Sequence, residues 1–396
     1  ITLDIGGTSA DVSLIANGQP STVHARHLAG FPLRLPALDV SAVGAGGGSI
    51  AWIDRDELLK VGPESAGADP GPACYDRGGS VATVTDANVL LGRLPSEALL
   101  DGRMPIRADL AKNAIDSLSA QLNLSLEDTA LGIVQVASAV IVKAMRAISV
   151  ERGHDPSAFT LFAYGGAGPL HAMEVAKELG IKKVFIPPNP GILCAEGLLS
   201  SDLIADFVKP ILCRFDESVI QNITLVWQDL NNQAVKWFQS EDVSDENRKT
   251  TWVADLRYEG QNFELSIPFE FDKFGKSEIE QLRSAFDEAH EVAYGYAQPN
   301  EYVELVNIKV KLSGVLAKPS LPKLAVSVDA KPISERKVCF QKGEWMETKV
   351  YRRLDLSRGQ SLTGPAIIEQ MDSIIVVFPG DIARVDDWGN LLVNIS

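Results

Sequence analysis

A short apolar strand that runs directly into two glycines opens the chain and strongly constrains its fold. Ile1–Ile5 and Asp11–Ile15 have the apolar pattern of strands, and Gly6–Ala10 between them has the residues of a tight turn. Glycines have no Cβ, so backbone N–H groups in such a turn can close around an anion. The two hydroxyl side chains that follow the glycines can add further donors. The sequence therefore predicts a hairpin whose turn either binds phosphate or only caps its own backbone groups.

Acidic residues stand on both sides of this turn. A carboxylate repels phosphate directly, but it suits Mg²⁺, which bridges phosphate oxygens and usually keeps water among its ligands. We therefore expect Asp4 and Asp11 to take part in catalysis, with Asp4 as the metal ligand. The residues expected to surround the phosphate are Gly6, Gly7, Thr8 and Ser9. The alternative, in which acids and hydroxyls only cap a hairpin, stays open at this point.

A second glycine run, Gly44–Ser49, follows the apolar segment Val40–Val43. It has serine where a dinucleotide-binding turn has its third glycine, and the chain continues as a strand rather than a helix. The pattern therefore does not fit a Rossmann turn. Gly46 and Gly47 are candidates for a loop that lines a nucleotide cleft or a cleft between domains. A bulge with a purely structural role is the alternative.

A third glycine run lies where the predicted strand Phe159–Tyr164 passes into a helix that begins near Pro169. Helix N-termini favour negative charge, and glycines allow a flat ring to pass close to the backbone. Two strand–glycine turns in one α/β unit can hold the two ends of one nucleotide. Gly165, Gly166 and Gly168 are therefore candidates for the end opposite the phosphates.

Strands, glycine turns and helical patterns mix over the first half of the chain, which is typical of an α/β domain. Residues 131–148 are apolar on two helical faces, so we expect a centrally packed helix there. Further helices are predicted near 219–238 and 276–293, and prolines near 317–325 indicate a linker. We expect an α/β domain over 1–205, an α+β region over 206–320 and a β-rich domain over 321–396.

The chain is acidic, with 37 lysines and arginines against 52 aspartates and glutamates, a net charge of −15. This charge argues against nonspecific electrostatic binding to nucleic acid or to an anionic membrane. The four cysteines are spaced neither as a disulfide framework nor as a zinc site. Reduced thiols are typical of the cytoplasm, so we expect a cytoplasmic protein that holds any anionic ligand locally.

The order of these motifs resembles two related groups of proteins. An aspartate-glycine-glycine-threonine hairpin, a long helix and a later strand–glycine turn resemble the second half of the actin, hexokinase and Hsp70 superfamily, whose ATPase fold is ribonuclease H-like. A closer resemblance is to the hydantoinase A and 5-oxoprolinase family, which includes N-methylhydantoinase and acetone carboxylase subunits. The segments that carry this closer resemblance are Asp4–Ile15, Gly44–Ala51, Val61–Tyr75, Thr85–Asn88, Gly165–His171 and, more thinly, Gly364–Glu369.

The resemblance implies ATP-dependent chemistry on a cyclic amide or a related carbonyl compound. ATP and Mg²⁺ are the implied cofactors, and the carbonyl oxygen is phosphorylated before the ring is opened or, in the ketone-carboxylating relatives, before carboxylation. A hydantoinase B-like partner subunit or fused half is also implied, and a homo-oligomer is a further alternative. Asp4 and the Gly6–Ser9 turn would surround phosphate and metal, and the Gly165–Gly168 turn would border the adenosine.

The chain has one aspartate-glycine-glycine-threonine hairpin, whereas the family also has a similar one near the start of the full-length protein. We therefore expect this chain to be a C-terminal portion of the subunit, inactive on its own. Two other functions stay open: another kinase or ATPase activator of the actin-like superfamily, and a non-catalytic scaffold or partner-binding subunit. The sequence leaves the substrate and the roles of Cys74, His171 and Arg152 undecided.

Overall fold

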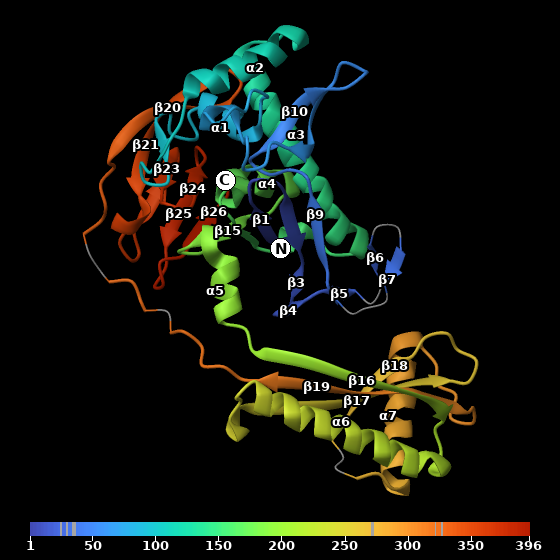
Figure 1. Cartoon of the computed structure of the whole chain (residues 1–396). Coiled ribbons are helices and arrows are strands. Elements are labelled where there is room, and N and C mark those ends of the chain that lie inside the picture. The colour runs from blue at the N-terminus through green and yellow to red at the C-terminus, as the bar shows by residue number, and fades with distance from the viewer. Residues whose placement is uncertain (24–25, 29–30, 34–36, 271–272, 321, 326–327) are drawn as a thin grey trace. The chain divides into compact units, whose positions relative to one another are not determined.

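A computed structural model divides the chain into two compact units, each with a hydrophobic core of its own (Figure 1). One unit consists of Ile1–Glu196 together with Leu321–Ser396, and the other of Gly197–Ser320. The structure describes all residues except 24–25, 29–30, 34–36, 271–272, 321 and 326–327, and leaves out the side chains of 26–28 and 32–33.

The first unit is built around an eight-stranded sheet of order β22-β25-β26-β15-β14-β1-β2-β9. Its strands are β1 (Thr2–Ile5), β2 (Ala10–Ser13), β9 (Val40–Val43), β14 (Leu161–Tyr164), β15 (Lys183–Ile186), β22 (Ser361–Thr363), β25 (Ile382–Val385) and β26 (Leu391–Asn394). The central strands β1, β14 and β15 run parallel, and their outer neighbours pair antiparallel. Because parallel strands end at the same edge of a sheet, the glycine turns after β1 and β14 adjoin.

The hairpin predicted at the start of the chain is confirmed. Leu3 and Val12 pair across β1 and β2, and both are fully buried because alternate side chains of each strand face the core. Asp4 and Asp11 form the neighbouring pair, so both acids project from the other face of the hairpin.

Two helices pack on this sheet. Helix α3 (Leu126–Ile148) contacts β2 and β9, helix α4 (Gly168–Leu179) contacts β1, β14 and β15, and the two helices contact each other. Helix α3 is long and apolar enough to cross a membrane by composition alone, but most of its apolar side chains are buried in the unit. The predicted central helix is thus confirmed. It begins at Leu126, before the apolar pattern, because Ser125 caps it by accepting from Asp128 N at 3.0 Å.

The C-terminal segment does not form the separate domain that the sequence predicted for 321–396. Its strands β22, β25 and β26 extend the main sheet, where β26 pairs with β15. A second sheet of order β20-β21-β23-β24 consists of β20 (Ser334–Gln341), β21 (Glu344–Arg352), β23 (Ala366–Glu369) and β24 (Ile374–Val377). Strand β24 packs on α4, so both parts of the chain share one core. Local sequence does not reveal which distant edge a strand pairs with.

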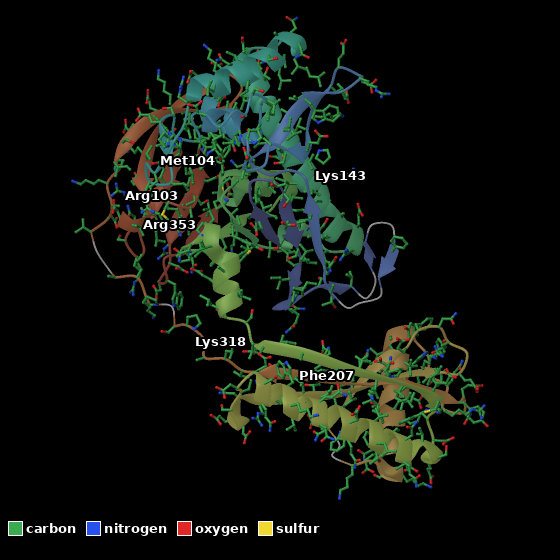
Figure 2. The ribbon with its side chains drawn as sticks, viewed as in Figure 1. Arg103, Met104, Lys143, Phe207, Lys318 and Arg353 are labelled. Carbon is green, nitrogen blue, oxygen red and sulfur yellow. The ribbon has the colours of Figure 1, made fainter. Side chains whose placement is uncertain are left out.

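Arg353 reinforces this union from a buried position in the C-terminal segment (Figure 2). Its Nη2 donates to Gly389 O at 2.7 Å and to Pro187 O at 3.3 Å, just after β15. Burial lowers the pKa of Arg353 to about 10, which still leaves the guanidinium charged near neutral pH. The side chain therefore bridges both parts of the unit.

The chain between β9 and α3 contains two helices that the sequence analysis did not assign. Its main elements are β10 (Ser49–Ile53), β11 (Leu59–Ser65), α1 (Val84–Leu90) and α2 (Ala108–Leu122). Asp86 in the first turn of α1 is fully buried, and it accepts hydrogen bonds from the backbone N–H groups of Ala73, Cys74 and Thr83. Asp86 therefore anchors the proline-rich segment 61–75 beside α1.

Short strands elsewhere in the unit are β3 (Ile15–Ala16), β4 (Gln19–Pro20), β5 (Thr22–Val23), β6 (Arg26–Leu28), β7 (Phe31–Leu33), β8 (Ala37–Leu38), β12 (Ala98–Leu99) and β13 (Met104–Pro105).

The second unit is an antiparallel sheet of order β16-β19-β17-β18 with two helices (Figure 1). Its elements are β16 (Leu203–Arg214), α6 (Ile220–Ser240), β17 (Arg248–Tyr258), β18 (Leu265–Phe269), α7 (Lys276–Tyr294) and β19 (Val303–Gly314). Helix α6 packs on β16 and β19, and α7 packs on β18, so both predicted helices are confirmed. The unit begins at Gly197 rather than at residue 206, within helix α5 (Leu193–Leu199). Lys318 pairs with Asp202 at 2.5 Å where the chain leaves the unit (Figure 2).

Two leucines on β26 test whether the C-terminal segment belongs to the first unit's core. Leu391 is 0% exposed and Leu392 is 37% exposed, although they are neighbours on one strand. We expect Leu391→Ala to lower the free energy of unfolding by about 2–5 kcal/mol and Leu392→Ala by less than about 1 kcal/mol. Chemical denaturation of both variants measures this difference. Equal, small losses would contradict a shared core.

Candidate functional site

The glycine turn after β1 lines a cavity of about 560 Å³ in the first unit. Gly6, Gly7 and Thr8 are exposed, and a Cβ added at either glycine would meet no atom within 4 Å. Within the described residues, the backbone N–H groups of Gly7 and Thr8 donate to no protein acceptor, whereas Gly6 N closes the turn onto Ser9 O at 3.1 Å. The turn therefore presents free amide donors beside open space.

The second glycine run is joined to this turn by backbone hydrogen bonds. Gly47 N donates to Gly6 O at 3.0 Å, and Gly48 N donates to Gly7 O at 2.6 Å. Gly47 and Gly48 line the cavity, whereas a Cβ on Gly46 would lie 2.7 Å from the backbone of Gly7. Gly47 therefore borders the cavity, and Gly46 allows two chain segments to pack closely.

Asp4 and Asp11 lie opposite each other beside the turn, although neither lines the cavity. Asp4 is half-buried and accepts a hydrogen bond from Cys194 Sγ at 3.3 Å, while Ser9 Oγ donates to Asp11 at 3.3 Å. Burial raises the pKa of Asp4, and the negative charge of Asp11 raises it further. The hydrogen bonds to the two carboxylates come from the uncharged Cys194 and Ser9 side chains, which leave the negative charges available to a cation.

This acid pair fits Mg²⁺ better than a metal that needs a complete protein cage. Among the residues that the structure describes, no cluster of three or more His, Cys, Asp or Glu side chains could hold a metal ion by itself. Mg²⁺ usually binds through one or two carboxylates and takes water and phosphate oxygens as its other ligands. Asp4, with Asp11 beside it, can supply that share of the coordination next to the free amides of the turn.

The third glycine run brings the start of α4 against β1. Gly165 has φ +80°, and a Cβ there would collide with Ile5 and with the Asp4 carboxylate. A Cβ on Gly168 would crowd the backbone of β1 as well. Gly166 lines the cavity, whereas Gly165 and Gly168 do not. The outer two glycines therefore serve close packing, and Gly166 is the one placed to meet a ligand.

Polar side chains from α1 and α4 line the cavity as well. Thr85 Oγ1 donates to Gly47 O at 2.8 Å and ties α1 to the second glycine run. Asn88 and His171 are 0% and 2% exposed, and Asn88 Nδ2 lies 3.5 Å from His171 Nε2. Burial lowers the pKa of His171 to about 4, so its ring is neutral near pH 7. His171, undecided from the sequence, is thus part of the cavity wall.

The C-terminal segment contributes a stretch of cavity wall that the sequence did not single out. Residues 370–373, which join β23 to β24, line the cavity together with Ile374, the first residue of β24. Asp372 accepts a hydrogen bond from Gly191 N at 2.8 Å, and Ser373 Oγ donates to Gly166 O at 3.2 Å. The flanking strands were predictable from their apolar runs, but the position of the loop depends on long-range pairing. Apolar residues of the lining include Leu94, Leu99, Leu100, Leu170, Met371 and Ile374.

Cys74 and Arg152 lie outside this cavity wall. Burial raises the pKa of the Cys74 thiol, and the neighbouring Asp86 carboxylate raises it further, so a thiolate nucleophile is disfavoured there. Arg152 forms an ion pair with Asp39. All four cysteines of the chain are free thiols.

The family of the chain follows from its match to known sequences. Residues 1–207 match the sequence profile of the hydantoinase/oxoprolinase family, and residues 215–393 match that of the hydantoinase/oxoprolinase C-terminal domain. The chain belongs to the hydantoinase/oxoprolinase family. The resemblance drawn from the sequence is thereby confirmed, and so is the expected fold class, α/β of the actin-like ATPase type.

Three relatives of the family extend this comparison. A nucleotide-free structure of acetone carboxylase matches with a TM-score of 0.92 at 25% identity, over 100% of this chain and 58% of that one. Caprolactamase subunit alpha of Pseudomonas jessenii is 36% identical over 96% of this chain and 56% of its own length. The crystal structure of the ATP-dependent caprolactamase from that organism gives a TM-score of 0.76. The 5-oxoprolinase of Saccharomyces cerevisiae is 31% identical over 97% of this chain, which spans 31% of that relative.

The buried, neutral His171 predicts a pH-dependent stability. The unfolded chain binds a proton at this residue below its ordinary pKa of 6.5, whereas the folded chain does so only near about 4. The contribution of His171 to the free energy of unfolding is therefore fully present above pH 6.5. It is lost as the pH falls toward 4, and the loss amounts to roughly 3 kcal/mol. We expect His171→Gln to flatten the profile over this window in denaturation experiments. An unchanged slope in the variant would contradict a neutral, buried His171.

Proposed function

We propose that this chain belongs to an ATP-dependent hydrolase subunit that phosphorylates the carbonyl oxygen of a cyclic amide before ring opening. Membership of the hydantoinase/oxoprolinase family supports this proposal. The names of two relatives, 5-oxoprolinase and an ATP-dependent caprolactamase, support it further, because both names denote cyclic-amide substrates. The chain spans between 31% and 58% of the length of these relatives, and the proposed activity is that of the protein that contains the chain.

The observation that carries the proposal is the open glycine turn of β1. The free N–H groups of Gly7 and Thr8 face open space, where a phosphate oxygen can accept from them, and the Thr8 hydroxyl adds a third donor. Gly47 and Gly166 line the same cavity from the two other glycine runs. The three glycine runs therefore border one cavity, with the free amides of the first run at its edge.

The acid pair gives the second part of the mechanism. Asp4 would hold Mg²⁺, and Asp11, which accepts a hydrogen bond from Ser9, would add negative charge beside it. When bound, Mg²⁺ and ATP supply charge neutralisation and the phosphoryl group. The residues of the chain then orient the polyphosphate and keep its reacting end in place, which is most of what phosphoryl transfer requires from a protein.

This chemistry suits an amide because its carbonyl carbon is a poor electrophile. Phosphorylation of the carbonyl oxygen makes the carbon electrophilic enough for water to add. The ring C–N bond then breaks, the nitrogen leaves as an amine with a proton from that water, and a second water hydrolyses the remaining acyl phosphate to carboxylate and inorganic phosphate. A hydantoinase B-like partner subunit or fused half would complete the reaction, and the designation of one relative as a subunit alpha supports such a partner. The free cysteines suit a cytoplasmic location. A kinase or ATPase activator and a non-catalytic scaffold remain the rival functions.

Gly7→Ala tests the phosphate-binding turn. A methyl group at this position meets no protein atom within 4 Å, so the fold tolerates it, but the group occupies space beside the free amides. We expect Mg²⁺-ATP to bind roughly 10- to 100-fold more weakly by calorimetry, with an unchanged Tm. Gly197→Ala is the matched control, because a Cβ also meets open space there and the residue lies outside the cavity. Equal affinities for both variants would contradict phosphate binding at the turn.

Product analysis tests the reaction itself. The protein at its full natural length, with its partner subunit, is incubated with Mg²⁺-ATP, bicarbonate and a panel of 5-oxoproline, hydantoin, N-methylhydantoin, caprolactam and acetone. We expect one ring-opened or carboxylated product with matching ADP release, and at least a roughly 100-fold loss of turnover in Asp4→Asn. ATP consumption without any product from a carbonyl compound would favour a kinase or ATPase activator. Full turnover in Asp4→Asn would remove Asp4 from the mechanism.

A further inference from the structure

Two fully buried polar residues of the cavity wall keep atoms without partners. Asn88 and His171 come from different helices, α1 and α4, and are 0% and 2% exposed. Among the described residues, Asn88 Oδ1 and His171 Nδ1 have no hydrogen-bond partner. A buried polar atom left unpaired costs about 1–3 kcal/mol, so a matched pair of them in one cavity points to a ligand that satisfies both.

Neighbouring contacts determine what each atom offers. Asn88 Nδ2 donates to Val84 O at 2.9 Å, which fixes the amide orientation and leaves Oδ1 as an acceptor. The same Nδ2 lies 3.5 Å from His171 Nε2, which is therefore the unprotonated nitrogen of a neutral ring. The proton of that ring then resides on Nδ1. Asn88 and His171, both residues of the cavity wall, thus hold one acceptor and one donor without partners among the described residues.

The two residues lie deeper along their helices than the groups that meet the glycine runs. Thr85, which bonds Gly47, precedes Asn88 by three residues, or about 4.5 Å of helix. Gly168, which packs on β1, precedes His171 by the same number of residues. A nucleotide whose polyphosphate lay at the glycine turn would reach Asn88 and His171 with its other end. Apolar side chains of the lining, such as Leu170, suit a flat ring there.

We propose that Asn88 and His171 read the edge of the nucleobase and select adenine over guanine, an inference that rests on the proposed ATP site. The 6-amino group of adenine donates to Asn88 Oδ1, and an adjacent ring nitrogen accepts from His171 Nδ1. Guanine and hypoxanthine carry a 6-oxo group in place of the amino group. Their oxygen would face the Asn88 acceptor, and the fixed amide cannot turn to accommodate it without losing its bond to Val84.

A cyclic amide also has a donor and an acceptor and is the competing occupant. The nucleobase is favoured because the phosphate turn and the Asn88–His171 pair line one cavity, so one nucleotide can engage both. A substrate amide has to meet the terminal phosphate instead, at the glycine-turn end.

Calorimetry on the protein at its full natural length tests the proposal with four probes: ATP, inosine triphosphate, GTP and tripolyphosphate. We expect wild type to bind ATP roughly 10- to 100-fold more tightly than inosine triphosphate or GTP. Asn88→Leu should bring the three nucleotides within a few-fold of one another and leave tripolyphosphate binding unchanged. His171→Asn, whose amide can still donate, should retain most of the preference. Asn113→Leu, the same change at an exposed position of α2, should behave as wild type.

The outcomes separate the two proposals. If wild type bound neither ATP nor tripolyphosphate, the result would overturn the nucleotide site itself and this inference with it. Equal affinities of wild type for ATP and inosine triphosphate would overturn only the recognition of the base. This measurement does not depend on any variant folding. Competition between caprolactam and ATP that disappears in Asn88→Leu would assign the pair to the amide rather than to the base.

Discussion

The parallel pairing of β1 with β14 is the constraint on which the rest of the site depends. It places the two glycine turns at one sheet edge, and Ala167 N secures them by donating to Ile5 O at 2.9 Å. The second glycine run then bonds to the first turn through Gly47 and Gly48. Glycine is needed where these backbones approach, as at Gly46 and Gly165, because a Cβ would collide with the neighbouring chain. Close packing of backbones thus leaves the amides of one turn free for an anion.

Much of this arrangement could be predicted from the sequence because its signals are local. The hairpin at Asp4–Asp11, the central helix and the strand–glycine turn at Gly165 each combine periodicity with turn residues within a short stretch. The same local signals could not separate glycines that meet a ligand from glycines that serve packing. That distinction depends on what lies opposite each residue, and it divides Gly166 from Gly165 and Gly168.

Long-range features were not predictable in this way. The C-terminal strands join the main sheet at β15, and residues 370–374 complete the cavity wall, because pairing over long sequence distances determines both positions. Asn88 lies on a short helix whose start is set by a capping box rather than by an apolar pattern. Its role becomes visible through its burial and its unpaired oxygen. The chemical role of polar residues in a cavity wall can therefore be inferred only once the fold is known.

A crystal structure of the protein at its full natural length with Mg²⁺ and a non-hydrolysable ATP analogue tests the central claim most directly. The account predicts phosphate oxygens within hydrogen-bond distance of Gly7 N and Thr8 N, with Mg²⁺ bound by Asp4 directly or through one water. A nucleotide bound elsewhere, with the β1 turn closed by protein atoms, would contradict it.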